Sequence, residues 1–264
     1  MTSTKIRFPP DLGRVEKLFR KERHGKAMLA LGPGDQLECI AQVGIQGDVH
    51  ANRLSPRQIL VTLQSELDAF DLVAGSLREN LVISSNATEF FRPGTALVMN
   101  NGVEIRLTMF CEPCQRLFPL VRDLGAMVNR RGILGRIEKG GTIALGESVL
   151  LYPDRYAALP ESAYQKFLDF VATIPAGKVV RYLDVAIAIG VADSFVRAIP
   201  GYIKRSAGRD LPLHRIVNAQ GKLLASMPDQ AEKLSAEGIR VEVGTAHGDQ
   251  ASAAVALASY LWRG

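Results

Sequence analysis

The sequence has few cysteines and no long apolar run. It holds three cysteines in 264 residues, Cys39, Cys111 and Cys114. An odd, low number argues against a disulfide framework and fits a reducing compartment. No stretch reaches the roughly 18 apolar residues that a membrane-spanning helix needs. Residues 1–26 lack the apolar core of a secretory signal. We therefore expect a cytoplasmic protein without a membrane partner.

Charge is modest overall but unevenly distributed. The chain has a net charge of +5, and its length fits two domains. Between Lys178 and Lys222 there are eight Lys and Arg residues against three Asp. Such a cluster is the footprint expected of a surface that contacts phosphates. The alternative is an ordinary solvated helix face.

The first part of the chain has the pattern of a mainly-β barrel. Residues 11–25 predict a short helix, and residues 113–129 predict a second one. Between and after them, short apolar or alternating runs predict strands within 37–49, 58–63, 80–84, 95–110 and 141–152. Asn101-Gly102 predicts a hairpin turn.

After a Pro-bracketed stretch the pattern becomes helical. Helices are expected within 162–174, 182–191 and 194–208, the last two as a helix-turn-helix. The predicted fold class is two domains, a mainly-β barrel followed by a mostly α winged-helix or helix-turn-helix domain. The expected boundaries are 1–153 for the barrel, 154–160 for a linker and 161–264 for the second domain.

The helical half carries ordered landmarks, from "FVATIPAGKVVRYLDVAIA" through "RDLPLHRIVNAQGKLL" to "KLSAEGIRVE". Together they resemble the DNA-binding domain of 6-O-alkylguanine-DNA alkyltransferases. Leu213 stands between Pro212 and His214, where that family has its reactive cysteine. The chain therefore looks like the alkyltransferase-like branch, which binds alkylated DNA without repairing it.

The resemblance implies a lesion pocket made of Leu213, His214, Arg215 and Glu237. His214 and Glu237 match the pair that activates the thiolate in the active enzymes. Leucine has no lone pair and no acidic proton, so alkyl transfer to this position is excluded. The alternative is that His214 and Glu237 form a structural pair in a vestigial fold.

The same resemblance implies a DNA-binding surface of Tyr182, Ser194, Arg197, Lys204 and Arg205. Tyr182 matches the tyrosine that rotates the phosphate during base flipping, and Arg197 matches the arginine that fills the vacated stack. A core aromatic and a surface charge are the alternatives. The chain departs from the family at Pro200, which predicts a kinked recognition helix, and at 222–230, where the loop forming one pocket wall differs.

The barrel half resembles a MOSC domain, a family named for the C-terminal region of molybdenum-cofactor sulfurases. The landmarks are "GIQGDVHANR", "RQILVTL", "LRENLVIS", "FCEPCQRL" and "GRIEKGGTIALGESVLL". The resemblance implies that Cys114 is the catalytic cysteine. It also implies that a molybdenum cofactor would be held by the polar residues Asp48, His50, Arg57, Glu79, Asn80 and Cys114. The alternatives are a tight turn with a buried polar pair at 47–50 and a rim salt bridge at Arg57.

Cys111 and Cys114 form a C-x-x-C pair. This spacing permits a reversible disulfide, which would block Cys114, or half of a zinc site. A second pair with zinc-site spacing is missing, so we expect no metal held by the protein alone. The chain is also too short for an aminotransferase-like domain, so no pyridoxal phosphate is expected.

Two functions follow from these resemblances. The first is a DNA-damage recognition protein whose partner is double-stranded DNA with alkylated or modified guanine, with other repair proteins as further partners. The second is a molybdenum-cofactor-dependent reductase or detoxifier of N-hydroxylated bases, which needs a redox partner and receives its substrate from the second domain. A third interpretation is that both domains are inactive scaffolds.

Overall fold

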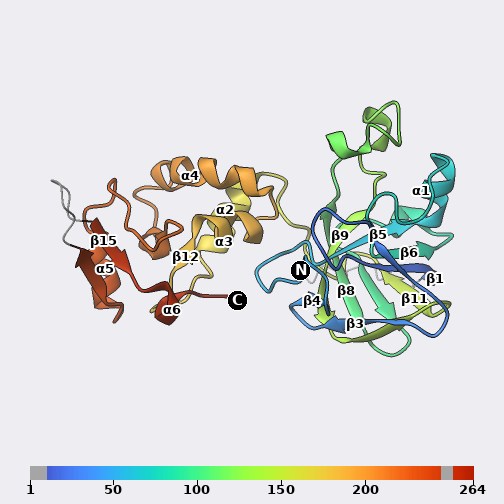
Figure 1. Ribbon diagram of the computed structural model, residues 1–264, viewed down its shortest axis with the longest axis horizontal. Helices are drawn as coiled ribbons and strands as arrows, with labels where there is room; N and C mark the ends of the chain where they lie inside the picture. The colour runs from blue at the N-terminus through green and yellow to red at the C-terminus, as the bar shows by residue number, and fades with distance from the viewer. Residues whose placement is uncertain (1–10, 245–251) are drawn as a thin grey trace, which may run out of the picture. The chain divides into compact units, whose positions relative to one another are not determined.

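The computed structural model describes residues 11–244 and 252–264. The chain divides into two compact units, Met1–Leu159 and Pro160–Gly264 (Figure 1). Within the described ranges, every helix is too short or too polar to cross a lipid bilayer.

The first unit is a closed β-barrel, as predicted. Its strands follow the order β11-β7-β8-β9-β5-β6-β1, and β1 pairs with β11 to close the ring. Only β5 and β6 are parallel in this ring. The strands are β1 (Asp11–Arg20), β5 (Ile59–Leu63), β6 (Leu81–Ser84), β7 (Ala96–Met99), β8 (Glu104–Phe110), β9 (Ile133–Lys139) and β11 (Ser148–Tyr152).

Smaller elements surround the barrel. Strand β2 (Leu29–Leu31) pairs antiparallel with the last residues of β1. A second sheet is formed by β10 (Gly141–Ala144), β3 (Gln36–Ile40) and β4 (Gly44–Ile45). The helical pieces are α1 (Gln64–Ala69) and the 3-10 helices η1 (Thr88–Phe90), η2 (Gln115–Leu117) and η3 (Gly125–Met127).

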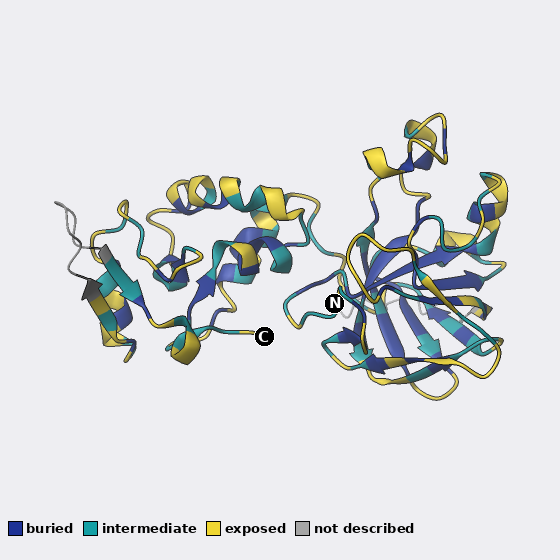
Figure 2. Ribbon diagram, in the orientation of Figure 1, coloured by how far each residue is buried: buried dark blue, intermediate teal, exposed yellow. Residues whose placement is uncertain are grey.

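Apolar side chains fill the inside of the barrel. Ile105 and Leu107 of β8 are fully buried, as is Ile137 of β9, and Figure 2 shows the barrel strands largely in the buried colour. The predicted hairpin is present, because β7 pairs antiparallel with β8 across the turn at Gly102, whose φ is +92°. Glycine tolerates this left-handed conformation without steric cost.

The helix predicted for residues 11–25 is wrong, because this segment contains β1. Val15 and Leu18 are both 1% exposed and lie three residues apart, which is helical spacing. They share the inner face because the pairing with β6 shifts register between Val15 and Lys17. A β-bulge adds one residue to a strand, so the spacing between two residues that face the same side increases from two to three at the bulge.

The helix predicted for residues 113–129 is also wrong. The segment forms only the short turns η2 and η3. Pro119 has no backbone N–H, so it cannot supply one of the hydrogen bonds that a longer helix needs, although Phe118 itself has helical dihedral angles. Gly125 also disfavours a helix, because glycine loses more backbone conformational entropy than other residues when a helix forms. Leu117 and Met127 are nevertheless buried, so the apolar pattern reflects packing rather than a helix.

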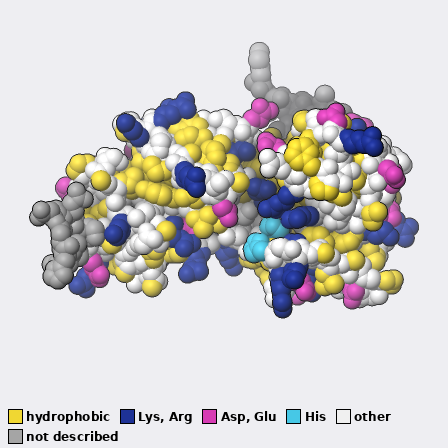
Figure 3. All heavy atoms as spheres, turned by 45° about the horizontal axis from the view of Figure 1, so that its top comes forward, with side chains coloured by type: hydrophobic (Ala, Val, Ile, Leu, Met, Phe, Trp, Pro, Cys, Tyr) yellow, Lys and Arg dark blue, Asp and Glu magenta, His cyan; other side chains and the backbone are white. Residues whose placement is uncertain are grey.

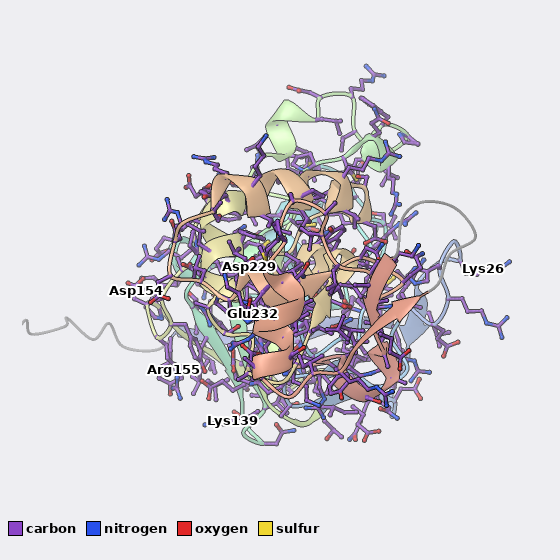
Figure 4. All side chains as sticks on the ribbon, turned by 90° about the vertical axis from the view of Figure 1, so that its left-hand side faces the viewer. Lys26, Lys139, Asp154, Arg155, Asp229 and Glu232 are labelled. Carbon is purple, nitrogen blue, oxygen red and sulfur yellow. The ribbon has the colours of Figure 1, made fainter. Side chains whose placement is uncertain are left out.

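The segment that follows β11 is attached to the barrel through Glu104. The Glu104 side chain is 1% exposed and lies 3.0 Å from Lys139 Nζ and 2.9 Å from Arg155 Nε. The Tyr156 hydroxyl donates to it at 2.6 Å. Lys139 and Arg155 are labelled in Figure 4. Burial works to raise the pKa of Glu104, but these partners lower it by more, so the carboxylate stays charged.

The second unit is mostly helical, as predicted. Its helices are α2 (Ala163–Val171), α3 (Tyr182–Ala188), η4 (Asp193–Ala198), α4 (Ile199–Arg205), η5 (Leu213–Arg215), α5 (Gln230–Ala236) and α6 (Leu257–Tyr260). Two small sheets complete it, one parallel, β12 (Val180–Arg181) with β13 (Ile216–Val217), and one antiparallel, β14 (Val241–Gly244) with β15 (Ser252–Val255). Phe167, Val171 and Ile199 are fully buried in its core.

Pro200 does not lie in the interior of the helix, contrary to the prediction. Residues 193–198 form the 3-10 helix η4, and α4 begins at Ile199, so Pro200 lies in the first turn of α4. Backbone N–H groups in a first turn have no partner within the helix, so proline costs little there. The predicted single helix is therefore two successive short ones.

Candidate functional site

Leu213 lies at a buried position between a helical turn and a strand. It is 5% exposed and begins η5, the helical turn that β13 follows directly. The Nε2 of Gln230 donates to the backbone oxygens of His214 and Ile216, at 2.9 Å each. Gln230 is fully buried and holds this segment in place. Gln230 was not predicted, because a single glutamine at the start of a helix belongs to no recognisable motif.

His214, Arg215 and Glu237 form one hydrogen-bonded cluster. His214 Nε2 lies 2.7 Å from Glu237 Oε1, and Arg215 Nη2 lies 2.7 Å from the same oxygen. The N–H of Gly177 donates to Glu237 Oε2 at 3.0 Å. Burial works to raise the pKa of Glu237, but Arg215, His214 and Gly177 lower it to about 2. The cluster thus joins three of the four predicted pocket residues through a carboxylate that is charged at neutral pH.

The predicted DNA-contact residues lie on three consecutive elements. Tyr182 begins α3 and is half-buried, and burial raises its pKa. The start of α3 is fixed by Arg181, whose Nη2 lies 2.8 Å from Asp184 Oδ1. The other four residues are exposed, with Ser194 and Arg197 on η4 and Lys204 and Arg205 in the last turn of α4.

In the barrel, Asp48 is the centre of a buried network. Its two oxygens accept hydrogen bonds from the N–H of Lys21, from the N–H and Nδ1 of His50, and from Nδ2 of Asn80, at 2.8 to 2.9 Å. Burial works to raise the pKa of Asp48, but the bonds from His50 and Lys21 lower it by more. Asn80 Oδ1 in turn accepts the N–H of Leu60. Asp48 and Asn80 therefore fix the turn that exposes the His50 imidazole.

A buried arginine, Arg131, contacts Cys114 and lies close enough to Glu79 for its charge to affect the pKa of that carboxyl. Arg131 is 9% exposed, and its Nη1 lies 2.7 Å from the Glu112 oxygen and 3.5 Å from Cys114 Sγ. Burial raises the pKa of Glu79, and the charge of Arg131 offsets part of that rise. Glu79 Oε2 and Arg131 Nε are buried without a hydrogen-bond partner within the described ranges. Arg131 was not predicted, because 16 residues separate it from Cys114 and no local motif joins the two.

Cationic side chains gather near the Asp48 turn. Lys21 is 3% exposed, and burial lowers its pKa, with Arg78 and Arg116 adding to the effect and Asp48 opposing it. Arg78 has a φ of +65°, an unfavourable conformation for a side chain with a Cβ. His24 and His50 meet edge-on, with ring centroids 6.3 Å apart. Figure 3 shows His side chains next to Lys and Arg side chains on one face.

The three cysteines differ in environment. Burial raises the pKa of Cys39 to about 12 and also raises that of Cys111. Arg57 is close enough to Cys111 for its charge to oppose that rise. Cys114 is half-buried, and all three thiols are free. The described ranges contain no group of three or more His, Cys, Asp or Glu side chains that could hold a metal ion.

Two known domain families match the chain. Residues 46–150 match the MOSC domain, and residues 162–239 match the DNA-binding domain of 6-O-methylguanine DNA methyltransferase. The chain is 36% identical over 103 residues to the DNA base-flipping protein of Escherichia coli strain K12, a match covering 34% of this chain and 79% of that relative.

Two solved structures resemble parts of the chain more distantly. The YUAD protein of Bacillus subtilis is 16% identical with a TM-score of 0.46, covering 55% of this chain and 98% of its own. S. pombe Atl1 in complex with DNA containing O6-carboxymethylguanine is 25% identical with a TM-score of 0.35, covering 40% and 99%. The chain therefore belongs to the family of the 6-O-methylguanine DNA methyltransferase DNA-binding domain, which matches residues 162–239 and here follows a MOSC domain.

Proposed function

We propose that this protein recognises alkylated or otherwise modified guanine in double-stranded DNA by flipping it out of the helix, without transferring the alkyl group. The observation that carries the proposal is Leu213, an apolar side chain placed directly before the His214–Glu237 pair. The 36% identical relative, which is named a DNA base-flipping protein, supports it.

Flipping a base breaks its stacking with the neighbouring bases, so the protein must supply groups that compensate for the lost stacking energy. Flipping a base costs a few kcal/mol and is cheapest for a damaged base that pairs poorly. The exposed Arg197 offers a planar, permanently charged group that can enter the vacated space. Tyr182 would turn the phosphate. An alkyl group buried against Leu213 would gain about 0.8 kcal/mol per CH₂.

The same site lacks the means to form a covalent bond. Alkyl transfer would form a thioether on a thiolate, with the guanine oxygen as leaving group. Leu213 has no such atom, and all three cysteines lie in the first unit. His214 would then contribute shape and hydrogen bonding to the pocket instead of activating a nucleophile.

The test is a pair of titrations with fluorescent duplexes, one with and one without 6-O-methylguanine. We expect tighter binding to the modified duplex, and we expect Arg197→Ala to reduce that preference. Mass spectrometry of the protein after incubation with the modified duplex should show no added methyl group. Equal affinity for both duplexes, or a methylated protein, would contradict the proposal.

A second function, binding of molybdenum cofactor by the barrel, is favoured by the surroundings of Cys114. Within residues 11–244 and 252–264, Glu79 and Arg131 each have a buried side-chain atom without a hydrogen-bond partner. Arg78 and Arg116 lie close enough to Lys21, beside Asp48, for their charges to lower its pKa, so they form a cationic group there. These residues fit an anionic cofactor that offers many hydrogen bonds. Cys114 would hold the metal, and His50 and Arg57 would contact the rest of the group. When bound, the cofactor would supply a metal–sulfur centre for reducing N-hydroxylated bases.

Cofactor binding is tested by content rather than by activity. The full-length protein, purified from a host that makes the cofactor, should contain molybdenum and pterin in equal amounts. Cys114→Ala should lose molybdenum, whereas Cys111→Ala should retain it. Absence of both components from the wild-type protein, even after reconstitution, would contradict this second function.

A further inference from the structure

Four arginines of the second unit differ in their contacts. Arg181 and Arg215 are paired with carboxylates, at 2.8 Å from Asp184 and 2.7 Å from Glu237. Arg205 and Arg209 are exposed, and in the part of the chain that the structure describes they have no carboxylate within ion-pair distance. The second group is therefore not committed to internal charge pairing.

Arg205 and Arg209 instead share one aromatic ring. The guanidinium carbon of Arg205 lies 4.0 Å from the ring centroid of Tyr164, and that of Arg209 lies 6.0 Å from it. Both distances are within the range of attraction between a cation and an aromatic face. Tyr164 thus places two positive charges next to each other.

The Tyr164 ring is fixed by its own contacts. Its hydroxyl is hydrogen-bonded to Ser206 Oγ at 2.9 Å, and Ser206 is fully buried. Tyr202 of α4 meets the ring edge-on with 5.1 Å between centroids. A ring held in this way forms a rigid platform, so ordering the two arginines costs less entropy when a ligand binds.

A tight turn brings Arg209 back to the ring. Helix α4 ends at Arg205, and Gly208 has a φ of +82°, which only glycine adopts readily. The N–H of Arg209 then donates to the Ser206 oxygen at 3.1 Å. Between the two arginines the sequence is Ser-Ala-Gly, without an acidic residue.

This arrangement suits an oxyanion with several oxygens. A guanidinium that stacks through its face keeps its N–H donors in the plane, where they can reach two oxygens of one phosphate. Two neighbouring cations repel each other, and a phosphate between them removes that repulsion. Lys204, also exposed, adds a third positive charge in the same turn.

We propose that Arg205 and Arg209, supported by Tyr164, clamp one backbone phosphate of the bound DNA. The proposal rests on the proposed function in that the second unit binds DNA. Arg209 precedes Leu213 by four residues, on the segment that leads from α4 to the lesion pocket. The clamp fixes the position of the strand there, and its contribution is the same for modified and unmodified DNA.

The experiment measures the affinity of the full-length protein for duplexes with and without 6-O-methylguanine across a range of salt concentrations. Arg209→Gln and Arg205→Gln should weaken binding to both duplexes by the same factor and should reduce the salt slope by about 1 each. Tyr164→Leu removes the ring but neither charge, so it should weaken binding to both duplexes. Tyr164→Phe keeps the aromatic face and loses only the hydrogen bond to Ser206, so it should weaken binding less than Tyr164→Leu. Arg240→Gln removes one charge from another exposed position of the same unit and should leave the slope unchanged.

The outcomes separate this inference from the proposed function. A wild-type salt slope in both arginine variants, or a loss confined to the modified duplex, would overturn the clamp and leave lesion recognition standing. Equal affinity of the wild-type protein for the two duplexes would overturn lesion recognition, while a reduced slope in the variants would still support the clamp. Absence of binding to either duplex would overturn both.

Discussion

His214 Nε2 lies 2.7 Å from a Glu237 oxygen that Arg215 also contacts at 2.7 Å. The carboxylate is therefore needed to balance an arginine as well as to orient the histidine. Such a cluster is expected to respond unequally to removal of its members.

Glu237→Gln should lower the free energy of unfolding by about 3 kcal/mol, because it leaves the largely buried Arg215 without a counter-charge. Urea unfolding of the full-length protein measures the loss. His214→Asn leaves the Arg215–Glu237 pair intact, so it should cost only about 1 kcal/mol. Equal losses in the two variants would show that the arginine pairing is not the dominant contribution.

Acid should remove the stabilising effect of Glu237. Its pKa is lowered from 4.5 to about 2. The associated stability, on the order of 3 kcal/mol, is thus fully present above pH 4.5 and is lost as the pH falls towards 2. The difference in unfolding free energy between wild type and Glu237→Gln should shrink over this interval. A difference that stays constant down to pH 2 would contradict the lowered pKa.

Asp48→Asn should destabilise the barrel by about 1–3 kcal/mol, because the new amide hydrogens face donors instead of acceptors. Chemical unfolding followed by far-UV circular dichroism measures the loss of unfolding free energy. Asp35→Asn is the matched control, since Asp35 accepts the N–H of Gly32 at 2.8 Å in an exposed turn. A control loss as large as that of Asp48→Asn would mean that the buried network adds nothing.

One thiol should react faster than the other two in the native protein. Cys39 and Cys111 are 3% and 4% exposed, and burial raises the pKa of both, whereas Cys114 is half-buried. Labelling with a chromogenic disulfide reagent should give one fast phase and two slow ones. Cys114→Ala should remove the fast phase and Cys111→Ala should keep it; a fast phase that persists without Cys114 would contradict the assignment.

The fold was predicted correctly where the local sequence pattern alone determines the secondary structure. The alternation along β8 and the Asn101-Gly102 turn identified the hairpin because both signals are local. Strand β1 was misassigned because the bulge near Lys17 placed Val15 and Leu18 on one face at helical spacing. No sequence signal distinguishes such a bulge from a helix without knowledge of the partner strand.

For the candidate site, the sequence identified motif residues but not the residues that support them. His214 and Glu237 were paired through a family resemblance, and they do meet at 2.7 Å. Arg131 and Gln230 were missed because each acts on a segment at least 14 residues away, Arg131 on Cys114 and Gln230 on the backbone around His214. Such contacts depend on the chain reversals between the segments, which single-sequence periodicity does not encode.

Glu104 determines where the two halves of the chain can be separated. Two of its three partners, Arg155 and Tyr156, lie after the last barrel strand. A fragment ending at Tyr152 would retain an almost inaccessible negative charge with only Lys139 beside it, whereas one ending at Leu159 keeps the full set. Residues 153–159 therefore belong with the barrel in any gene fusion, circular permutation or transplant that uses it as a module.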